Sequence, residues 1–438
     1  MSQFDRTNKT NVAETRCLRI IIVGAGLSGI GAAISCALGG HSVTVLESAA
    51  QIAEIGAGLQ ITPNASRLLR HWGLSEAFWA RGSVPKVLTV HRYSGAVLAR
   101  QTEFDQKILS NYGAPFIDMH RADLQIAMVS RAHELGVKFH LGERVVSIDF
   151  EQPSITTKAG NRYSGDLIVA ADGLWSRCRE IYLGRSDPPL PTGDLAYRIV
   201  LTIDELKDED LKQWVQNPEV HCWIGPGSHV VGYSLRASTT YNLVLLCPDN
   251  LPADVAKATG SIEEMKQLFI GWDPVLTRFL SHVKTIDKWK LTHMNEASNL
   301  VSIGDSCHPM LPYLAQGANS SLEDGAVLGG FLGNISSKSQ LPNALRMYER
   351  LRKEGGEAIV RETFKQRHDF HMPDGPEQEA RDELFMSRLG KEEQVAEPFP
   401  SRWTCPVVQP WLYGYDAVQE VENVVKSHRG FSVAGERL

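Results

Sequence analysis

A chain of 438 residues, 43% of them hydrophobic and 22% charged, has the composition of an ordinary globular protein. Its 45 Lys and Arg residues against 51 Asp and Glu residues give a net charge of −6, which offers no electrostatic reason to expect nucleic acid or an anionic membrane as a partner. The seven cysteines are scattered and form no CxxC pair, and no histidines follow HExxH-type spacing. Neither a disulfide framework nor a metal site is therefore predicted.

The chain starts with a polar stretch, residues 1–17, which lacks the apolar core of a signal peptide and is expected to be a flexible leader. No apolar run approaches the length of a membrane span, so a cytoplasmic protein is expected. The apolar run Leu18 to Val23 then predicts a buried parallel strand, Leu27 to Leu38 a helix packed on it, and Ser42 to Leu46 a second strand. These three elements form a compact βαβ unit.

Further along, the pattern predicts a second set of elements and then a change of architecture. A helix over Arg121 to Leu135 and a buried strand over Asp166 to Ala171 come first. Short β-rich runs then indicate a separate sheet, and the chain afterwards returns to a buried strand and a long amphipathic helix. The expected elements of this part are strands over Leu195 to Ile203, His229 to Leu235, Tyr241 to Leu246 and Leu300 to Ile303, a helix over Leu341 to Phe370, a surface loop or helix over Pro373 to Leu389, and an aromatic tail over Arg402 to Tyr415 that packs back on the body.

Glycines follow the first strand at a spacing typical of dinucleotide binding. Gly24 permits a tight turn, Gly26 lets the backbone approach a pyrophosphate, and Gly29 lets helix and strand pack closely. The N-terminus of the helix would then face the phosphates with free N–H groups. Glu47 ends the second strand, where its carboxylate can accept both ribose hydroxyls of an adenosine. This fingerprint by itself does not distinguish NAD from FAD.

Later motifs favour FAD over NAD, because they resemble motifs of a known flavoprotein family. The run from Ala170 to Arg179, which contains Asp172, resembles the "DG" motif of class A flavoprotein monooxygenases, and the run from Gly304 to Pro309, which contains Asp305, resembles their "GD" motif. The latter continues through residues 312–319 and 322–326, and the tail 409–416 also fits. The resemblance covers roughly residues 18–415. The arrangement is similar to that of salicylate hydroxylase and para-hydroxybenzoate hydroxylase, and most of all to the fungal subgroup that hydroxylates and dearomatises polyketide phenols.

The resemblance implies an FAD site. Asp305, at the end of a buried strand, can bind ribityl hydroxyls, although a helix-capping role is an equally good interpretation from local sequence. Gly317 and Ala318 can start a helix whose N–H groups point at the flavin pyrimidine edge. By resemblance alone, Asp172, Arg121 and Gly58 also belong to the cofactor site.

The resemblance also implies a phenol site on the inserted sheet. Arg198 would stabilise a phenolate, and Tyr233, on a strand that could neighbour that of Arg198, would donate a hydrogen bond that fixes the ring. The alternatives are an Arg198 paired with a structural carboxylate and a Tyr233 packed in the core. The pair Cys307 and His308 is not interpreted as a nucleophile pair, because neighbouring side chains point apart and no orienting acid is evident.

The predicted fold class is α/β: a Rossmann-like FAD-binding domain of the para-hydroxybenzoate hydroxylase type, with an inserted β-sheet substrate domain and C-terminal helices. The expected division is residues 18–190 and 291–340 for the FAD-binding domain, 191–290 mainly for the substrate-binding sheet, and 341–438 for the helical and tail region. Only one glycine fingerprint is present, so NADPH or NADH would bind transiently.

The predicted function is an FAD-dependent monooxygenase that uses NAD(P)H and O₂ to hydroxylate a small phenol. We expect a fungal polyketide phenol of secondary metabolism, with ortho hydroxylation or oxidative dearomatisation. Two alternatives stay open: a decarboxylating hydroxylase of the salicylate type, and a flavin reductase or dehydrogenase that inserts no oxygen. The expected partners are the phenol, O₂ and NAD(P)H, without nucleic acid or membrane. The sequence predicts no oligomeric state.

Overall fold

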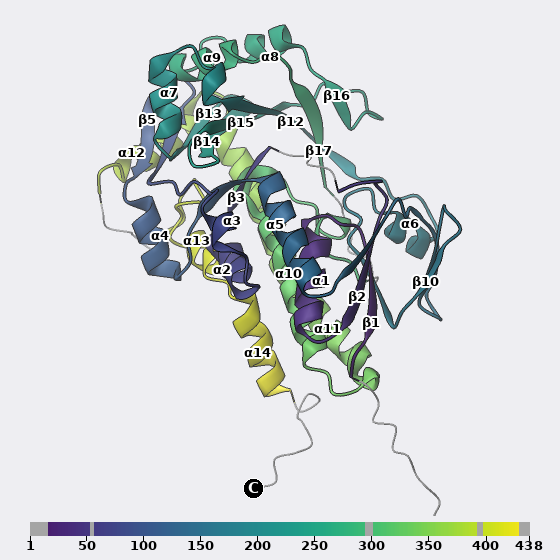
Figure 1. The fold of residues 1–438 in the computed structure, drawn as a ribbon. Coiled ribbons are helices and arrows are strands. Elements are labelled where there is room, and N and C mark those ends of the chain that lie inside the picture. The colour runs from purple at the N-terminus through teal and green to yellow at the C-terminus, as the bar shows by residue number, and fades with distance from the viewer. Residues whose placement is uncertain (1–15, 53–56, 294–300, 392–396, 429–438) are drawn as a thin grey trace, which may run out of the picture.

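A four-stranded parallel sheet forms the core of the N-terminal part (Figure 1). The computed structural model describes residues 16–52, 57–293, 301–391 and 397–428, so residues 1–15 of the expected leader lie outside the described residues. The strand order is β11–β1–β2–β7, and every pairing is parallel. The bounds are β1 (Arg19–Val23), β2 (Ser42–Glu47), β7 (Lys138–Leu141) and β11 (Leu167–Ala170).

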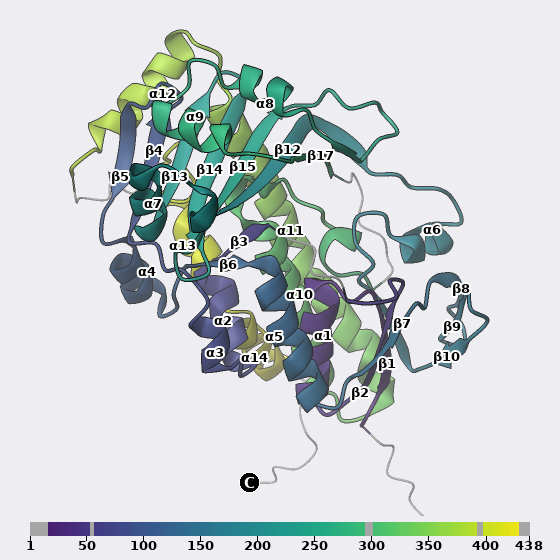
Figure 2. The same ribbon diagram turned by 45° about the horizontal axis from the view of Figure 1, so that its top comes forward.

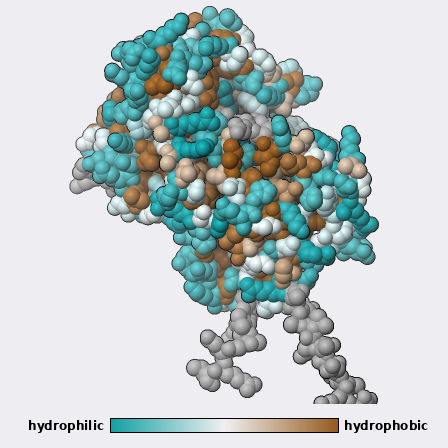
Figure 3. Space-filling view, viewed as in Figure 1, coloured by the Kyte–Doolittle hydropathy of each residue, from teal (hydrophilic) through white to brown (hydrophobic). Residues whose placement is uncertain are grey.

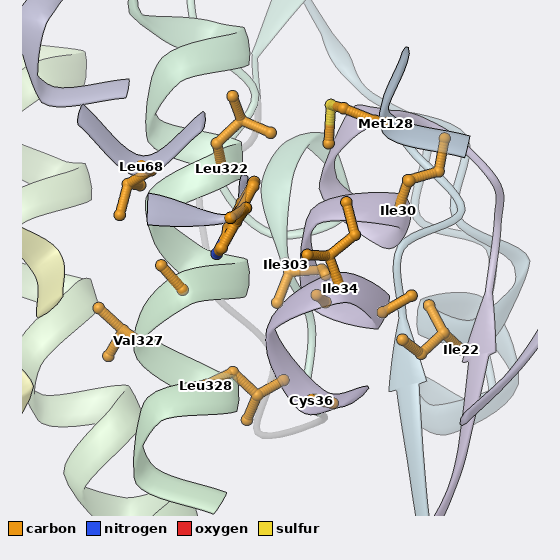
Figure 4. Close-up of a cluster of buried hydrophobic side chains, with 14 of the residues drawn as sticks. Ile22, Ile30, Ile34, Cys36, Leu68, Met128, Ile303, Leu322, Val327 and Leu328 are labelled. Carbon is orange, nitrogen blue, oxygen red and sulfur yellow. The ribbon is translucent and has the colours of Figure 1, made fainter. Parts of the chain in front are cut away.

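Helix α1 (Leu27–Leu38) has the predicted bounds and connects β1 to β2. Its length is consistent with the run of small and apolar residues that packs it against the sheet and against α10 (Gln316–Gly333). Figure 4 shows this packing, with Ile30 and Ile34 of α1 lying between Ile22 of β1 and Leu322 of α10. The α1 helix is therefore enclosed between the sheet and a second buried helix, which fixes its N-terminus in place.

The strand predicted over Leu300 to Ile303 is wrong in extent. Leu300 lies outside the described residues, and Ser302 makes only a single-residue parallel bridge to Ala170 at the end of β11. The chain then turns at Gly304, whose φ of 62° is in the left-handed region that favours glycine. This turn ends the pairing and begins the short 3₁₀ helix η2 (Gly304–Ser306).

An eight-stranded sheet forms the second body, seen at the top of Figure 1 and turned toward the viewer in Figure 2. Its order is β16–β17–β12–β15–β14–β13–β4–β5, and only the pair β13 and β4 is parallel. The predicted strands of the inserted sheet are confirmed as β12, β14 and β15. The bounds are β4 (Val87–Arg92), β5 (Val97–Gln101), β12 (Leu190–Thr202), β13 (Glu219–Gly225), β14 (Ser228–Leu235), β15 (Thr240–Pro248), β16 (Lys257–Thr259) and β17 (Asp287–His293). Strands β4 and β5 come from the stretch that the sequence assigned to the cofactor domain.

The two faces of the large sheet have different partners because side chains alternate along each strand. On β12, Tyr197 and Ile199 pack in a core with the helices α7 to α9 that cover one face. Arg198, between them, lies on the opposite face, which looks toward the parallel sheet. Alternation thus assigns one set of residues to the core and leaves the other to form a site.

The remaining elements frame these two sheets. The long helix predicted over Leu341 to Phe370 is confirmed as α11, and the aromatic tail packs back on the body, with Trp403 and Tyr413 buried beside Phe370. The other helices are α2 (Pro63–His71), α3 (Glu76–Trp79), α4 (Phe104–Tyr112), α5 (Arg121–Glu134), α6 (Arg177–Leu183), α7 (Glu209–Gln216), α8 (Ile262–Leu268), α9 (Pro274–Ser281), α12 (Pro376–Ser387), α13 (Val408–Tyr413) and α14 (Ala417–Ser427). The remaining strands are β3 (Gly58–Ile61), β6 (Ile117–His120), β8 (Val145–Asp149), β9 (Ser154–Thr157) and β10 (Arg162–Ser164).

The surface in the view of Figure 3 is mainly hydrophilic over the upper body, and hydrophobic side chains gather near the middle of this face. Within the described residues, no helix combines the length and the apolar character needed to cross a bilayer.

Candidate active site

Two adjoining cavities lie between the parallel sheet and the large sheet. The large cavity has a volume of about 1190 Å³ and the small cavity about 280 Å³. Both are lined by Gly26, Leu27, Arg121, Arg198, Asp305 and Met310, so the two cavities meet along a shared wall. Of the predicted site residues, those that line the small cavity are Gly26, Gly58, Arg121, Arg198, Tyr233, Asp305, Gly317 and Ala318, and Glu47 lines the large one.

The glycines at the start of α1 have two different roles: Gly24 and Gly29 permit close packing, and Gly26 leaves open space for a ligand. Gly24 has a φ of 107°, and a Cβ there would lie 2.3 Å from the backbone oxygen of Ala171. A Cβ on Gly29 would lie 2.0 Å from the backbone oxygen of Gly24. Both glycines are therefore required for close backbone contact, whereas a Cβ on Gly26 would meet nothing within 4 Å and would point into open space. Gly26 is the position at which a bound phosphate has room to approach.

Glu47 is bound to the glycine turn in a way that the sequence did not predict. Its Oε2 accepts a hydrogen bond from the backbone N–H of Ala25 at 2.8 Å, and its Oε1 accepts one from Ala49 at 2.8 Å. The carboxylate thus ties the end of β2 to the turn before α1 while it lines the large cavity. Its proposed contact with ribose hydroxyls stays a prediction.

Asp172 lies apart from both cavities. Its Oδ1 accepts a hydrogen bond from the Ser176 hydroxyl at 2.6 Å and its Oδ2 one from the backbone N–H of Cys178 at 2.9 Å. The carboxylate therefore supports the first turn of α6. The neighbouring Gly173 lines the small cavity, so the "DG" turn reaches the site through its backbone.

Asp305 projects from η2 into both cavities. Burial in the cleft raises the pKa of the Asp305 carboxyl, and the nearby cations Arg121, His308 and Arg198 oppose that rise. The structure shows no hydrogen bond to this carboxylate from any described residue. An acceptor group without a partner, at the junction of two cavities, is available to a ligand.

The N-terminus of α10 faces the small cavity. It follows Ala315, a residue in the left-handed conformation with a φ of 54°, and the short 3₁₀ helix η3 (Pro312–Leu314). A Cβ on Gly317 would meet nothing within 4 Å, so open space lies in front of the first helical turn. This arrangement agrees with the predicted anion-stabilising helix end at Gly317 and Ala318.

Because Gly58 has no side chain, its backbone can lie close to the large sheet. A Cβ there would lie 2.7 Å from Cε2 of Tyr233, and the backbone N–H of Gly58 donates to Oδ1 of Asn242 at 2.9 Å. The glycine lets β3 approach the substrate-side face of the large sheet and also lines the small cavity.

Arg198 and Tyr233 both reach the small cavity, although their strands are not neighbours. Strand β15 lies between β12 and β14, which corrects the expectation that the two strands could be adjacent. Arg198 pairs in register with Val244, and Val244 pairs with Val231, two residues before Tyr233. The two side chains therefore share one face of the sheet across an intervening strand.

Tyr233 packs in a hydrophobic cluster and also lines the small cavity, so its predicted role toward a substrate stays a prediction, as does that of Arg198. Within the described residues, Arg198 forms no salt bridge; its guanidinium lies 5.8 Å from the ring centre of Trp289. Burial, followed by the charge of Arg121, lowers the pKa of Arg198, and Tyr233 and Asp305 oppose the shift. Burial raises the pKa of Tyr233, so its hydroxyl keeps its proton, and no described residue forms a hydrogen bond with that hydroxyl.

His308 has an acid partner that the sequence did not reveal. Its Nε2 lies 2.5 Å from Oδ2 of Asp324, which also accepts from the backbone N–H of Gly304 at 2.8 Å. Arg352 donates to the other oxygen of Asp324 at 2.7 Å. Burial lowers the pKa of His308, but the Asp324 carboxylate and the Cys307 side chain together raise it well above the usual range. The orienting acid therefore exists 16 residues away, and it anchors the turn that carries Asp305.

The thiol of Cys307 lies close to this pair, and one ligand atom from each of Cys307, His308 and Asp324 falls within 4.8 Å of the other two. Both oxygens of Asp324 already accept hydrogen bonds from cations or from the backbone. The three groups are thus explained as an ion-pair network around the "GD" turn, and metal binding is not needed to account for them.

Gln60 is a further cavity residue that sequence reasoning did not single out. It is the polar side chain in the apolar strand β3, two residues after Gly58, and it is only 6% exposed. A polar residue inside a short apolar strand was the available signal, because burial of an amide requires a hydrogen-bonding partner.

The described residues fit an FAD molecule. Open space lies before the first turns of two helices of 12 and 18 residues, at Gly26 and Gly317. The side chains of Arg121 and Asp305 face the same cavities without hydrogen-bonding partners in the part of the chain that the structure describes. Arg121 and the N-terminus of α1 could hold the diphosphate, Asp305 the ribityl hydroxyls, and the N-terminus of α10 the flavin ring edge.

Known proteins share both the sequence and the fold. Residues 18–363 match the family model of an FAD binding domain. The FAD-dependent monooxygenase OpS4 of Beauveria bassiana is 49% identical over 419 residues, which cover 93% of this chain and 97% of OpS4. The 3-hydroxybenzoate 6-hydroxylase of Polaromonas naphthalenivorans is 29% identical over 407 residues, or 91% of this chain and 96% of that enzyme.

A crystal structure of CtdE in complex with FAD and a substrate superposes with a TM-score of 0.78 at 21% identity, covering 94% of this chain and 98% of CtdE. At this identity the likeness concerns the fold alone, and it confirms the predicted α/β architecture of the para-hydroxybenzoate hydroxylase type. The family match, the relatives and the cavities that fit FAD agree: the chain belongs to the FAD-binding-domain family of class A flavoprotein monooxygenases, which act on aromatic compounds.

Proposed function

We propose that this monooxygenase uses NADPH or NADH together with O₂ to hydroxylate a small phenol at a carbon ortho to the phenolic oxygen. The substrate would be a polyketide phenol of secondary metabolism, and its ring would lose aromaticity where the hydroxylated carbon already carries a substituent. The 49% identical FAD-dependent monooxygenase supports oxygen insertion, and the 3-hydroxybenzoate 6-hydroxylase among the relatives supports an aromatic substrate.

One observation carries the proposal: a cation and a hydroxyl without hydrogen-bonding partners face the small cavity together. Arg198 and Tyr233 both line it, and neither forms a hydrogen bond with a described residue. Tyr233 is 3% exposed, and a buried hydroxyl normally has a hydrogen-bonding partner, whereas Arg198 is exposed, so that a ligand can reach its guanidinium. A phenolate oxygen would satisfy both.

The charge balance of the cavity favours the ionised phenol. Arg198 and Arg121 face it, and burial together with their mutual repulsion lowers the pKa of Arg198. Asp305 is the carboxylate that opposes this repulsion. An anionic oxygen next to Arg198 would relieve the repulsion, and the same interaction would lower the pKa of the bound phenol.

Tyr233 would fix the orientation of the ring. Because its pKa is raised, the hydroxyl remains a donor at the pH of catalysis and can donate to the phenolate oxygen while Arg198 neutralises the charge. Val231, Val244 and Leu246 form an apolar wall beside these two groups and exclude water from the ring.

When bound, FAD accepts a hydride from the nicotinamide and activates O₂ for transfer to the ring. The chain's own contribution is therefore to hold the electron-rich ring carbon in front of the flavin site, between the large sheet and the N-terminus of α10. The flavin-side residues Pro312, Gly317 and Ala318 line the same small cavity as Tyr233, which sets the two reactants next to each other.

The proposal is tested by reducing the FAD-loaded enzyme without oxygen, using NADPH or NADH in the presence of a panel of phenols, and then admitting O₂. We expect one class of phenol to accelerate flavin reduction and to leave as a product heavier by one oxygen atom from ¹⁸O₂. Flavin reduction without oxygen in any product would contradict the proposed hydroxylation, and a flavin that neither nucleotide reduces would contradict the proposed electron donor.

A further inference from the structure

Strand β12 carries a buried acid four residues before Arg198. Asp194 is 1% exposed, and Ala196, two positions further along, packs in a small hydrophobic cluster with Leu246 and Tyr313. From Asp194 onward β12 pairs with β15 without a register shift, and side chains alternate along a strand. Asp194, Ala196 and Arg198 therefore project from the same face of the large sheet, with roughly 13 Å along the strand between the acid and the arginine.

The Asp194 carboxylate binds the loop on the flavin side of the small cavity. The hydroxyl of Tyr313, in η3, donates a hydrogen bond to Oδ2 of Asp194. Burial, and after it the Asp194 carboxylate, raises the pKa of Tyr313, so the hydroxyl keeps its proton and is the donor. Of the hydrogen bonds between described residues, this is the one that joins η3 to the large sheet. Pro312 of η3 lines the small cavity, and η3 leads directly into the N-terminus of α10. One hydrogen bond thus connects the strand of Arg198 to the loop beside the flavin site.

Both partners of this hydrogen bond are held in place by further contacts. Arg367 of α11 donates to both oxygens of Asp194, from Nη2 to Oδ1 at 2.8 Å and from Nε to Oδ2. The buried carboxylate is therefore paired with a cation, as a buried charge requires. The ring centre of Tyr313 lies 5.0 Å from that of His229 and 5.7 Å from that of His371. Packing thus holds the tyrosine ring, and its hydroxyl adds a directional contact to a fixed acceptor.

We propose that Tyr313 and Asp194 are positioning residues, whose hydrogen bond fixes the flavin-side loop relative to the strand that holds the substrate. The inference rests on the proposed function, because it takes the phenol to be bound at Arg198. In coupled turnover, one atom of O₂ enters the ring and the other leaves as water. In uncoupled turnover, O₂ leaves as hydrogen peroxide with the hydride of NAD(P)H and a proton from solvent, and the phenol is unchanged. A displacement of about 1 Å can slow a reaction step about 100-fold, so the position of the loop decides between these two outcomes.

The experiment measures the ratio of oxygenated product to hydrogen peroxide in Tyr313→Phe, using a phenol that the wild type oxygenates. This variant keeps the packed ring, and Asp194 keeps both hydrogen bonds to Arg367, so the chain should fold and bind FAD. We expect the ratio to fall about 10- to 100-fold, the scale for a displacement of up to 1 Å. The dissociation constant of the phenol, read from the change in flavin absorbance without NAD(P)H, should stay at the wild-type value, because the contacts at Arg198 and Tyr233 are intact.

Tyr241→Phe is the matched control, because Tyr241 is fully buried in the same sheet but its hydroxyl accepts a hydrogen bond from Trp214 on the opposite face. Its melting temperature should fall while the product-to-peroxide ratio stays that of the wild type. Asp194→Ala removes the same hydrogen bond from the strand side, and the side chain of Arg367, which is 35% exposed, can then be solvated. Asp194→Ala should also lower the ratio, and adding Tyr313→Phe to it should lower the ratio no further.

A product-to-peroxide ratio in Tyr313→Phe equal to that in Tyr241→Phe would overturn the inference, and so would losses that multiply in the double variant. Phenol binding weakened by the same factor as the ratio would also overturn it, because the hydrogen bond would then act on affinity. If neither Tyr313→Phe nor Asp194→Ala binds FAD, the bond serves cofactor binding and the inference fails. These outcomes leave the proposed function standing, whereas a wild type that oxygenates no phenol would contradict the proposed function and the inference with it.

Discussion

Arg198 and Tyr233 project from one face of the large sheet, with Val244 of the intervening strand in register beside Arg198. Two strand spacings, roughly 10 Å, separate their strands. Long side chains on such strands can converge on a small ring from two sides, whereas adjacent strands would hold them in contact with each other. The intervening strand therefore leaves the space that the proposed phenol would need between the cation and the hydroxyl.

Arg198→Ala is expected to slow hydroxylation with little effect on folding or FAD content. The guanidinium forms no salt bridge with a described residue, and its removal relieves repulsion with Arg121. Loss of a charge-assisted contact at the reacting oxygen should cost about 2 to 4 kcal/mol of transition-state stabilisation, and kcat/KM should fall accordingly. Arg100→Ala, on β5 at the far end of the same sheet, is the control and should keep wild-type kcat/KM. An unchanged kcat/KM in Arg198→Ala would place the phenol elsewhere.

Tyr233→Phe is expected to uncouple NAD(P)H consumption from product formation. The substitution keeps the buried ring and removes only a hydroxyl that has no partner among the described residues, so packing should survive. A ring held by Arg198 alone can pivot, and NAD(P)H oxidation should then yield hydrogen peroxide in place of product, with a binding loss of about 1.5 to 3 kcal/mol.

The measurement for Tyr233→Phe is the ratio of product to NAD(P)H consumed, with peroxide counted in parallel. Tyr197→Phe is the matched control, because Tyr197 lies next to Arg198 on β12 but packs in the core on the other face of the sheet. Equal coupling in Tyr233→Phe and wild type would mean that Tyr233 only packs.

Gly26→Val is expected to abolish FAD binding. The space beside Gly26 is open in the protein itself, so the chain should still fold, but the valine side chain would occupy the place of the diphosphate. The measurement is FAD released per chain on denaturation, expected to be about one for the wild type on the basis of one fingerprint. Gly355→Val, at another open glycine on α11, should retain its FAD. Full occupancy in Gly26→Val would contradict the assignment of the fingerprint.

The pair His308 and Asp324 predicts a defined pH dependence of stability. The pKa of His308 is raised in the folded state, so its contribution is complete below the unfolded value of about 6.5 and is lost as pH rises through the folded pKa. The pKa of Asp324 is lowered to about 2, so its contribution is present above the unfolded value of about 3.9 and is lost as pH falls toward 2. The pair should therefore stabilise the fold most between about pH 4 and 6.5.

His308→Gln keeps a donor for Asp324 but removes the charge, so its melting temperature should fall below that of the wild type, by the equivalent of about 1 to 3 kcal/mol near pH 5. The difference in melting temperature between the wild type and His308→Gln should become smaller toward pH 9. The comparison is His371→Gln: burial lowers the pKa of His371 to about 4, so protonation of the unfolded chain disfavours folding of the wild type below an unfolded value of about 6.5, and the wild type should gain stability relative to His371→Gln as pH rises from about 5 to 7, the opposite trend. A stability difference between wild type and His308→Gln that instead grows as pH rises toward about 6.5 would mean that His308 is uncharged in the folded protein.

The local elements of this protein follow from its sequence. Helix α1 has the predicted bounds because its small residues and the glycines before it specify a helix packed closely on a strand. Helix α11 and strand β14 are likewise close to prediction, since a long amphipathic run and a short β-rich run carry their own periodicity. The positions of Gly26 and Asp305 beside the cavities also follow from the sequence, because each lies within a motif of contiguous residues.

Only the tertiary structure decided which distant residues share the site. Strand order placed β15 between Arg198 and Tyr233 and brought β4 and β5 into the large sheet, and no local pattern encodes strand order. Asp324 meets His308 because α10 crosses the "GD" turn, and Gln60 donates a hydrogen bond to Asp118 because β3 and β6 pair across 58 residues. Periodicity determines which face of its own element a residue occupies, but the partner on that face is chosen by the packing of elements that are far apart in the chain.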